Sequence, residues 1–271
     1  MASQQSLLLP LFLLALSTDA VSNGIADGTL RSDLDPMKTA FLLWASSSGV
    51  FSAFEPRSCL AEVTWSTADI SAGAAWFPAT YPPQRLRGWQ IAGWDSPVTS
   101  RGDASFVHPQ SLHDELLAAF GGDHLSFDTI DEFDDSAAWY AETARALPRR
   151  VARRAEMACW LLEHHPTDVA AFYFGEGDTA PHHLWAFHDP GSPRRPPEVD
   201  PLLEGALAAV YEALDDAVGR LVSAAGDNCP VVVLSDHGEE FKEHGRFLHD
   251  QLYQELLHVP LIIRNPSLAE G

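Results

Sequence analysis

The chain has 271 residues, which is long enough for one large α/β domain with a substantial hydrophobic core. Thirty-eight acidic residues against seventeen basic ones give it a formal net charge of -21. This charge disfavours a nucleic-acid partner or an anionic membrane surface, because both attract a clustered basic face.

Residues 7–16 (LLLPLFLLAL) form an apolar run of the length found in secretory signal peptides. The segment before the run has no Lys or Arg and the cleavage site is poor, so a buried leading helix is the alternative. The run is too short to span a bilayer as a helix, and no transmembrane span is expected. We therefore interpret residues 1–24 as a signal-like segment or leading helix, and favour a cytoplasmic over a secreted or periplasmic location.

From about residue 74 the chain alternates short apolar runs with helical stretches, which is typical of a layered α/β domain. Residues 109–120 predict a short helix that begins at a proline and stops at two glycines. The acidic residues 123–135 predict a loop, and residues 137–165 predict a long helix that is interrupted at Pro148.

Four arginines cluster in the middle of that long helix, at positions 149, 150, 153 and 154. We expect them to form a solvated face that pairs with local acidic residues. Cys159 follows on the same helix and is expected to be a small buried residue. With three widely spaced cysteines and no C-x-x-C pair, neither a disulfide framework nor a cysteine-rich zinc site is expected.

The second half of the chain predicts two buried strands joined by a helix. Residues 169–175 (VAAFYFG) and 231–234 (VVVL) are continuously apolar, and an amphipathic helix is expected over residues 201–225 after a Pro-rich loop. A strand, a crossover helix and a strand in this order imply a parallel pair. The predicted fold is a three-layer α/β domain with a mostly parallel sheet and helices on both faces.

Polar residues follow both predicted strands. Asp178 and Asp236 each come just after the carboxyl end of a strand, where open α/β sheets place their active sites. In a helix, Asp178 and His182 would point in the same direction and could share one ion. Asp236 and His237 form a second pair on a loop, and His249 follows twelve residues later.

Carboxylate oxygens together with imidazole nitrogens suit Zn, Mn or Fe-type ions better than metals that prefer thiolates. Two such ions a few ångströms apart would clamp the attacking and leaving oxygens of an in-line displacement. One Asp–His pair alone is as often an ordinary hydrogen-bonded turn, but two pairs that both end buried strands favour a metal centre. His183 and His188 lie off the paired spacing, and we expect no ligand role for them.

Residues 231–264 (VVVLSDHGEEFKEHGRFLHDQLYQELLHVPLIIR) resemble the metal-binding end of the alkaline phosphatase superfamily, especially its sulfatase and type I phosphodiesterase branches. Residues 172–190 (FYFGEGDTAPHHLWAFHDP) resemble the phosphodiesterase and nucleotide pyrophosphatase branch, in which a D-x-x-x-H pair binds one metal. The resemblance covers roughly residues 73–265. It implies a single alkaline phosphatase-like domain over residues 25–271, incomplete at both ends.

The resemblance also implies two divalent metal ions, Zn or Mn in the first place and Ca or Mg as alternatives. Asp178, His182 and His249 would hold one ion. Asp236 and His237 would hold the other, together with an early aspartate and a nucleophile at a helix N-terminus.

The early half matches these branches less closely. Sulfatases carry C/S-x-P-S-R, which residues 59–63 (CLAEV) do not match, so a formylglycine sulfatase is disfavoured. The phosphodiesterase branch uses a Thr or Ser shortly after a Pro and ten residues before a Gly, and Thr39 fits that spacing. Its alternative role is an ordinary helix-start threonine. Asp27, in the sequence IADG, has the local form of the early ligand but lies only twelve residues before Thr39.

Lys242 and His244, on the loop after the D-H-G sequence, are candidates for contacts with substrate oxygens, and simple solvation is the alternative. The resemblance implies a metal-dependent hydrolase of small-molecule phosphate esters that forms an ester–enzyme intermediate. Two other functions stay open. One is a sulfatase-type hydrolase of sulfate esters, and the other is an inactive or truncated metal-binding paralogue.

Overall fold

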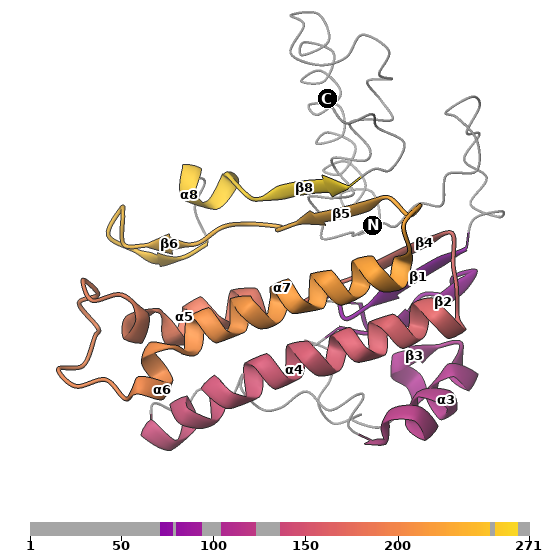
Figure 1. Ribbon diagram of the computed structural model, residues 1–271, viewed down its shortest axis with the longest axis horizontal. Coiled ribbons are helices and arrows are strands. Elements are labelled where there is room, and N and C mark those ends of the chain that lie inside the picture. Colours follow the sequence, from indigo (N-terminus) through magenta and orange to yellow (C-terminus); the bar gives the residue numbers. More distant parts are fainter. Residues whose placement is uncertain (1–70, 78–79, 94–103, 123–135, 250–252, 265–271) are drawn as a thin grey trace, which may run out of the picture. The chain divides into compact units, whose positions relative to one another are not determined.

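The computed structural model describes residues 71–77, 80–93, 104–122, 136–249 and 253–264 (Figure 1). The expectations for the N-terminal apolar run, for Asp27 and Thr39, and for the loop at 123–135 lie outside these residues. The chain divides into two compact units. Of the described residues, Val233–Gly238 and His249–Ile262 belong to the smaller unit, and all others belong to the larger unit.

The larger unit contains a four-stranded sheet in the order β3-β2-β1-β4. Strand β1 (Ala72–Ala75) pairs in parallel with β2 (Gly88–Ile91) and with β4 (Val169–Phe172), whereas β3 (Val107–His108) runs antiparallel to β2. The expected mixed α/β fold with a mostly parallel sheet is therefore confirmed. The three-layer arrangement stays a prediction.

Large aromatic side chains fill the core of this sheet. Trp76, Trp89 and Phe172 are buried. The ring centroid of Phe172 lies 6.1 Å from that of Trp76 and 5.8 Å from that of Trp89. Gly73 stands opposite Trp89 in the β1–β2 register, and a Cβ at Gly73 would lie only 2.2 Å from the indole ring. Helix α3 (Gln110–Phe120), close to the range predicted, and the C-terminal half of α4 complete this core.

Helix α4 (Ala137–His164) is a single helix of 28 residues, and its first turn is capped by Ser136, whose Oγ accepts from the backbone N–H of Trp139. The expected interruption at Pro148 is wrong. A proline removes one backbone hydrogen bond and crowds the preceding turn. Here Leu147 and Val151, on either side of it, are completely buried, so tertiary packing keeps the helical path. Cys159, further along α4, is a partly buried free thiol.

The helix expected over residues 201–225 is divided into two, α6 (Pro201–Glu204) and α7 (Ala206–Ala225), with Gly205 between them. Glycine is among the residues least favourable to a helix interior, which accounts for the position of the break. Helices α4 and α7 run side by side (Figure 1), and Val151, Ala155 and Ala217 form the core between them. Helix α5 (Glu176–His188) packs against both.

The described C-terminal strands form two two-stranded sheets. Strand β5 (Val231–Leu234) pairs with β8 (Leu261–Arg264), and β6 (Glu240–Phe241) forms an antiparallel hairpin with β7 (Phe247–Leu248). The expected parallel pair between residues 169–175 and 231–234 stays a prediction, because β4 is an edge strand with β1 on one side and β5 extends into the smaller unit. A connecting helix implies that two strands run parallel, but it does not say which strands become neighbours.

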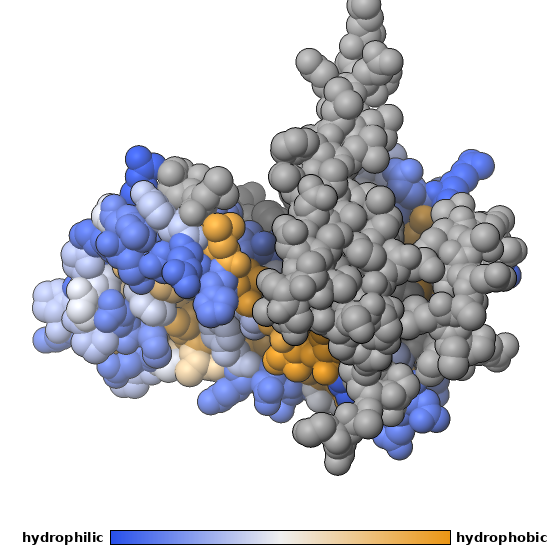
Figure 2. Space-filling model, turned by 90° about the horizontal axis from the view of Figure 1, so that it is seen from above, coloured by the Kyte–Doolittle hydropathy of each residue, from blue (hydrophilic) through white to orange (hydrophobic). Residues whose placement is uncertain are grey.

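The surface of the described residues is mainly hydrophilic on the face shown in Figure 2, with separate apolar patches. Exposed apolar side chains include three consecutive residues of β8, Leu261, Ile262 and Ile263. None of the helices in the described part of the chain is long and apolar enough to cross a membrane.

Candidate metal centre

Helix α5 starts four residues after β4 and carries the first predicted pair. The carbonyl oxygen of Gly175, its N-cap residue, accepts from the backbone N–H of Asp178 at 3.2 Å and of Thr179 at 3.0 Å. Asp178 therefore lies in the first turn, where a negative side chain interacts favourably with the helix dipole. One turn later, His182 Nε2 lies 3.5 Å from Asp178 Oδ1. The expected common direction of these two side chains is confirmed.

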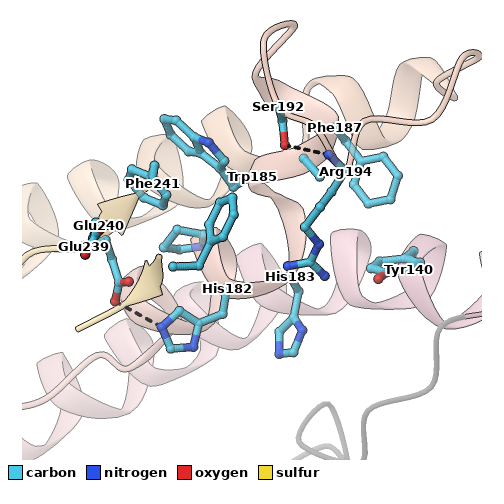
Figure 3. A pocket seen from close by; sticks show the side chains of 13 residues that line it. Tyr140, His182, His183, Trp185, Phe187, Ser192, Arg194, Glu239, Glu240 and Phe241 are labelled. Carbon is cyan, nitrogen blue, oxygen red and sulfur yellow. Dashed lines mark hydrogen bonds and ion pairs between the residues drawn. The ribbon is translucent and has the colours of Figure 1, made fainter. Parts of the chain in front are cut away.

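A third polar residue, Glu239 at the start of the β6–β7 hairpin, joins this pair. His182 Nε2 donates to Glu239 Oε1 at 3.0 Å, and Figure 3 shows the two side chains facing each other. One carboxylate oxygen of Asp178 and one of Glu239 lie within 4.8 Å of each other. The hydrogen bond to Glu239 raises the pKa of His182. Partial burial lowers this pKa, and the negative charge of Asp178 raises it. Sequence reasoning did not include Glu239, although its place directly after D-H-G was a signal.

Helix α5 also contains a proline, and α7 compensates for it. Pro181 has no N–H to donate to the carbonyl of Gly177, four residues earlier. Tyr211 of α7 donates its hydroxyl to that carbonyl oxygen at 3.3 Å. Desolvation raises the pKa of Tyr211, and the negative charges of Glu239 and Asp178 raise it further, so the phenol stays protonated as a donor.

The second predicted set lies in the smaller unit. Asp236 and His237 follow β5, and the ring of His237 stacks on that of His249 with centroids 3.9 Å apart and planes at 22°. One ring nitrogen of each histidine lies within 4.8 Å of the other. His237 Nδ1 is 3.1 Å from the carbonyl oxygen of Gly238. In the tautomer that donates this bond, the ring carries its lone pair on Nε2.

Residue 238 lies so close to the backbone of another segment that only a glycine fits there. A Cβ at this position would lie 2.0 Å from the carbonyl oxygen of Glu255 in α8 (Gln254–Leu257). The N–H of Gly238 also donates to the carbonyl oxygen of Leu256 at 2.8 Å. The glycine of the D-H-G sequence thus lets the chain that carries Asp236 and His237 pack directly against α8.

Lys242 and His244 lie exposed on the turn between β6 and β7. The buried carboxylate of Glu240 holds this turn, because its Oε1 accepts from the backbone N–H groups of His244 at 2.9 Å and Arg246 at 3.0 Å. Lys242 has a positive φ of 89°. The proposed substrate contacts of Lys242 and His244 stay predictions.

The two histidines outside the predicted spacing contact aromatic rings. His183 lies edge-on to Trp139 with centroids 5.0 Å apart, and burial lowers its pKa. His188, at the end of α5, is exposed and lies against Trp185.

The expected solvated arginine face is correct for two arginines and wrong for the other two. Arg149 pairs with Glu142, and Arg153 pairs with Glu156, as expected for local acidic partners. Arg150 and Arg154 are instead largely buried and pair with one carboxylate from another element, that of Glu176. A partner so distant in sequence is not visible in the local pattern of α4.

A cavity of about 90 Å³ opens beside His182 and Glu239 (Figure 3). Trp185 and Phe241 stack on its wall, with centroids 3.7 Å apart and planes at 7°. Arg194 also lines it, with the guanidinium 5.8 Å from the centre of the Phe247 ring. All of these residues belong to the larger unit.

Carboxylate and imidazole groups that follow a parallel strand of an α/β fold are the features expected of the alkaline phosphatase superfamily. Within that superfamily, the model of the type I phosphodiesterase / nucleotide pyrophosphatase family matches residues 22–261. The chain belongs to this family.

Among individual proteins, arylsulfatase K of Xenopus laevis is 34% identical to the chain over 74 residues. The match covers 24% of this chain and 14% of that relative, so the chain corresponds to only a small part of the relative's length. No solved structure matches the chain.

Proposed function

We propose that the chain is a divalent-metal-dependent hydrolase of phosphate esters, of the phosphodiesterase or phosphatase type. One observation carries the proposal: a carboxylate, an imidazole and a second carboxylate gather after β4 in a member of this family. Asp178, His182 and Glu239 supply these groups, with His182 Nε2 3.5 Å and 3.0 Å from the two carboxylates.

The donor set fits a divalent ion. Two carboxylates around one imidazole attract a cation, and hard oxygen with borderline nitrogen suits Zn or Mn, with Ca or Mg as alternatives. We propose that Asp178, His182 and His249 hold one ion. Glu239 is a further candidate ligand, because one of its carboxylate oxygens lies within 4.8 Å of one of Asp178 and because a bound ion would replace the proton that His182 Nε2 shares with Glu239.

We propose that Asp236 and His237 hold the second ion. Asp27 is the proposed early ligand and Thr39 the proposed nucleophile, both from the matched family region.

Bound metal ions would supply positive charge for the ester oxygens and would activate the attacking hydroxyl. The residues of the chain orient and admit the substrate. The cavity beside His182 and Glu239 offers an ester a path to these groups, and Arg194 on its wall is a cationic donor for ester oxygens. Lys242 and His244 are proposed to contact the substrate from the neighbouring turn.

Metal stoichiometry on the purified chain tests the proposal directly. We expect two ions per chain, and we expect Asp178→Asn and His182→Ala each to lose an ion and most turnover of p-nitrophenyl phosphate or bis-p-nitrophenyl phosphate. His188→Ala is the matched control, because His188 is an exposed histidine on the same helix. A chain that binds no divalent ion would contradict the proposal.

A sulfatase-type activity is the second candidate, and the similarity to arylsulfatase K favours it. Turnover of p-nitrophenyl sulfate above that of both phosphate substrates would select it. Bound metal without turnover of any ester would instead identify an inactive metal-binding paralogue. Unchanged activity in Thr39→Ala would exclude Thr39 as the nucleophile.

A further inference from the structure

A buried charge cluster holds the beginning of helix α5. Glu176 is the first residue of this helix and is 0% exposed. Arg150 Nε donates to Glu176 Oε1 at 2.7 Å, and Arg154 Nη1 forms an ion pair with the same oxygen at 2.9 Å. Both arginines come from α4, one helical turn apart, so they present one face of α4 to α5.

This cluster differs from ordinary helix-surface ion pairs in its burial. The side chains of Arg150 and Arg154 are only 10% and 5% exposed. Arg154 also lies over the ring of Trp76, 5.5 Å from its centre, at the end of β1. Removing charges from water can cost as much as buried ion pairs return, so the burial of this cluster is weak evidence that it serves stability. Directional fixation of α5 is a second role that such a buried, directional cluster can serve.

The geometry of an α-helix connects the cluster to the candidate metal ligands. Successive side chains turn by about 100°, so Asp178 and His182 lie roughly 200° and 240° around α5 from Glu176. Anchoring Glu176 against α4 therefore directs the other two side chains to the opposite side of α5. On that side His182 meets Glu239. The rotation of α5 about its own axis therefore determines the direction in which Asp178 and His182 point.

We propose that Arg150, Arg154 and Glu176 are positioning residues of the metal centre, and that they fix the rotation of α5 so that Asp178 and His182 face one ion. The inference rests on the proposed function in taking Asp178 and His182 as metal ligands. The Arg150–Glu176 hydrogen bond is directional, and it acts together with the buried apolar side chains of α5 on the same face, Ala180, Leu184 and Phe187.

The test replaces the whole cluster by apolar residues of similar size, in the variant Arg150→Met/Arg154→Leu/Glu176→Leu. Replacing a complete buried ion cluster in this way is often neutral for stability, so the fold is retained. We expect the affinity for Co²⁺ and Zn²⁺, measured by competition with a chromophoric chelator, to fall about tenfold or more. The visible absorption of bound Co²⁺ should also change, because it reports ligand geometry. The urea unfolding midpoint should stay near that of the wild type.

The matched control is Arg149→Met/Glu142→Gln, which removes an ion pair of 2.7 Å on the same helix with both side chains 65% exposed. It should change neither metal affinity nor the Co²⁺ spectrum. Unchanged affinity and spectrum in the folded triple variant would overturn the inference while leaving the proposed function intact. A wild-type chain that binds no metal would overturn both.

A milder variant decides the question if the triple variant does not fold. Arg150→Lys keeps the charge but loses the planar guanidinium that reaches Glu176 through Nε. We expect weaker metal binding and an altered Co²⁺ spectrum in this folded variant. Wild-type values for both would overturn the inference.

Discussion

Replacing Glu176 by glutamine should destabilise the fold strongly. The amide has nearly the shape of the carboxylate but no charge, so Arg150 and Arg154 would remain buried beside each other without a counterion. Burial already lowers the pKa of Arg154, with Glu176 opposing this effect and Arg150 adding to it. Removing one partner of a buried ion pair costs about 3–5 kcal/mol. Against a total stability of about 5–15 kcal/mol, this is a large fraction.

Urea unfolding followed by circular dichroism measures this loss. The control is Arg149→Met, whose ion pair with Glu142 is mostly exposed and is expected to contribute about 0–1 kcal/mol. The apolar triple variant of the cluster should recover most of the stability that Glu176→Gln loses. A Glu176→Gln variant within about 1 kcal/mol of the wild type, at an unchanged urea slope, would refute the assignment of a buried, charge-compensated cluster.

Three further predictions concern single groups. Gly238→Ala should lose about 1–3 kcal/mol in urea unfolding, because its Cβ would overlap the backbone of α8, whereas Gly219→Ala in α7 meets no neighbouring atom and should gain about 1 kcal/mol. Equal changes in unfolding free energy for Gly238→Ala and Gly219→Ala would contradict the close approach of Gly238 to α8. Tyr211→Phe should lose about 0.5–1.5 kcal/mol, and less in a Pro181→Ala background, where the restored backbone N–H can satisfy the same carbonyl. Additive losses would exclude this compensation. Burial raises the pKa of the Cys159 thiol, and only the thiolate is nucleophilic. With the other cysteines replaced by serine, the rate at which iodoacetamide modifies Cys159 should therefore rise at a higher pH in the folded chain than in an unfolded control. The same pH dependence in both would contradict this.

The parts of the fold that could be predicted are those that local pattern determines. Continuous apolar runs gave the strands at 169–172 and 231–234, and the four-residue spacing of Asp178 and His182 gave their common direction on a helix. Each of these inferences needs only neighbouring residues in the chain, because helix and strand periods are local properties.

The parts that could not be predicted depend on residues far apart in sequence. Arg150 looks like a surface residue until Glu176, 26 positions later, is placed against it. Glu239 lies 57 positions from His182, its hydrogen-bond partner. Strand β5 pairs with β8, a neighbour that the local pattern did not predict, because neighbour choice in a sheet is set by tertiary packing.

The departures from local rules concentrate on α5 and its neighbours. This helix of 13 residues contains an internal proline, which removes a backbone hydrogen bond, and begins with a fully buried glutamate, whose charge is removed from water. Each is compensated from another helix: Tyr211 of α7 satisfies the carbonyl that the proline leaves, and two arginines of α4 neutralise the glutamate. A helix chosen for stability alone would need neither partner. Rules broken at a cost are expected where function requires them, which agrees with the proposal that α5 carries the metal ligands Asp178 and His182.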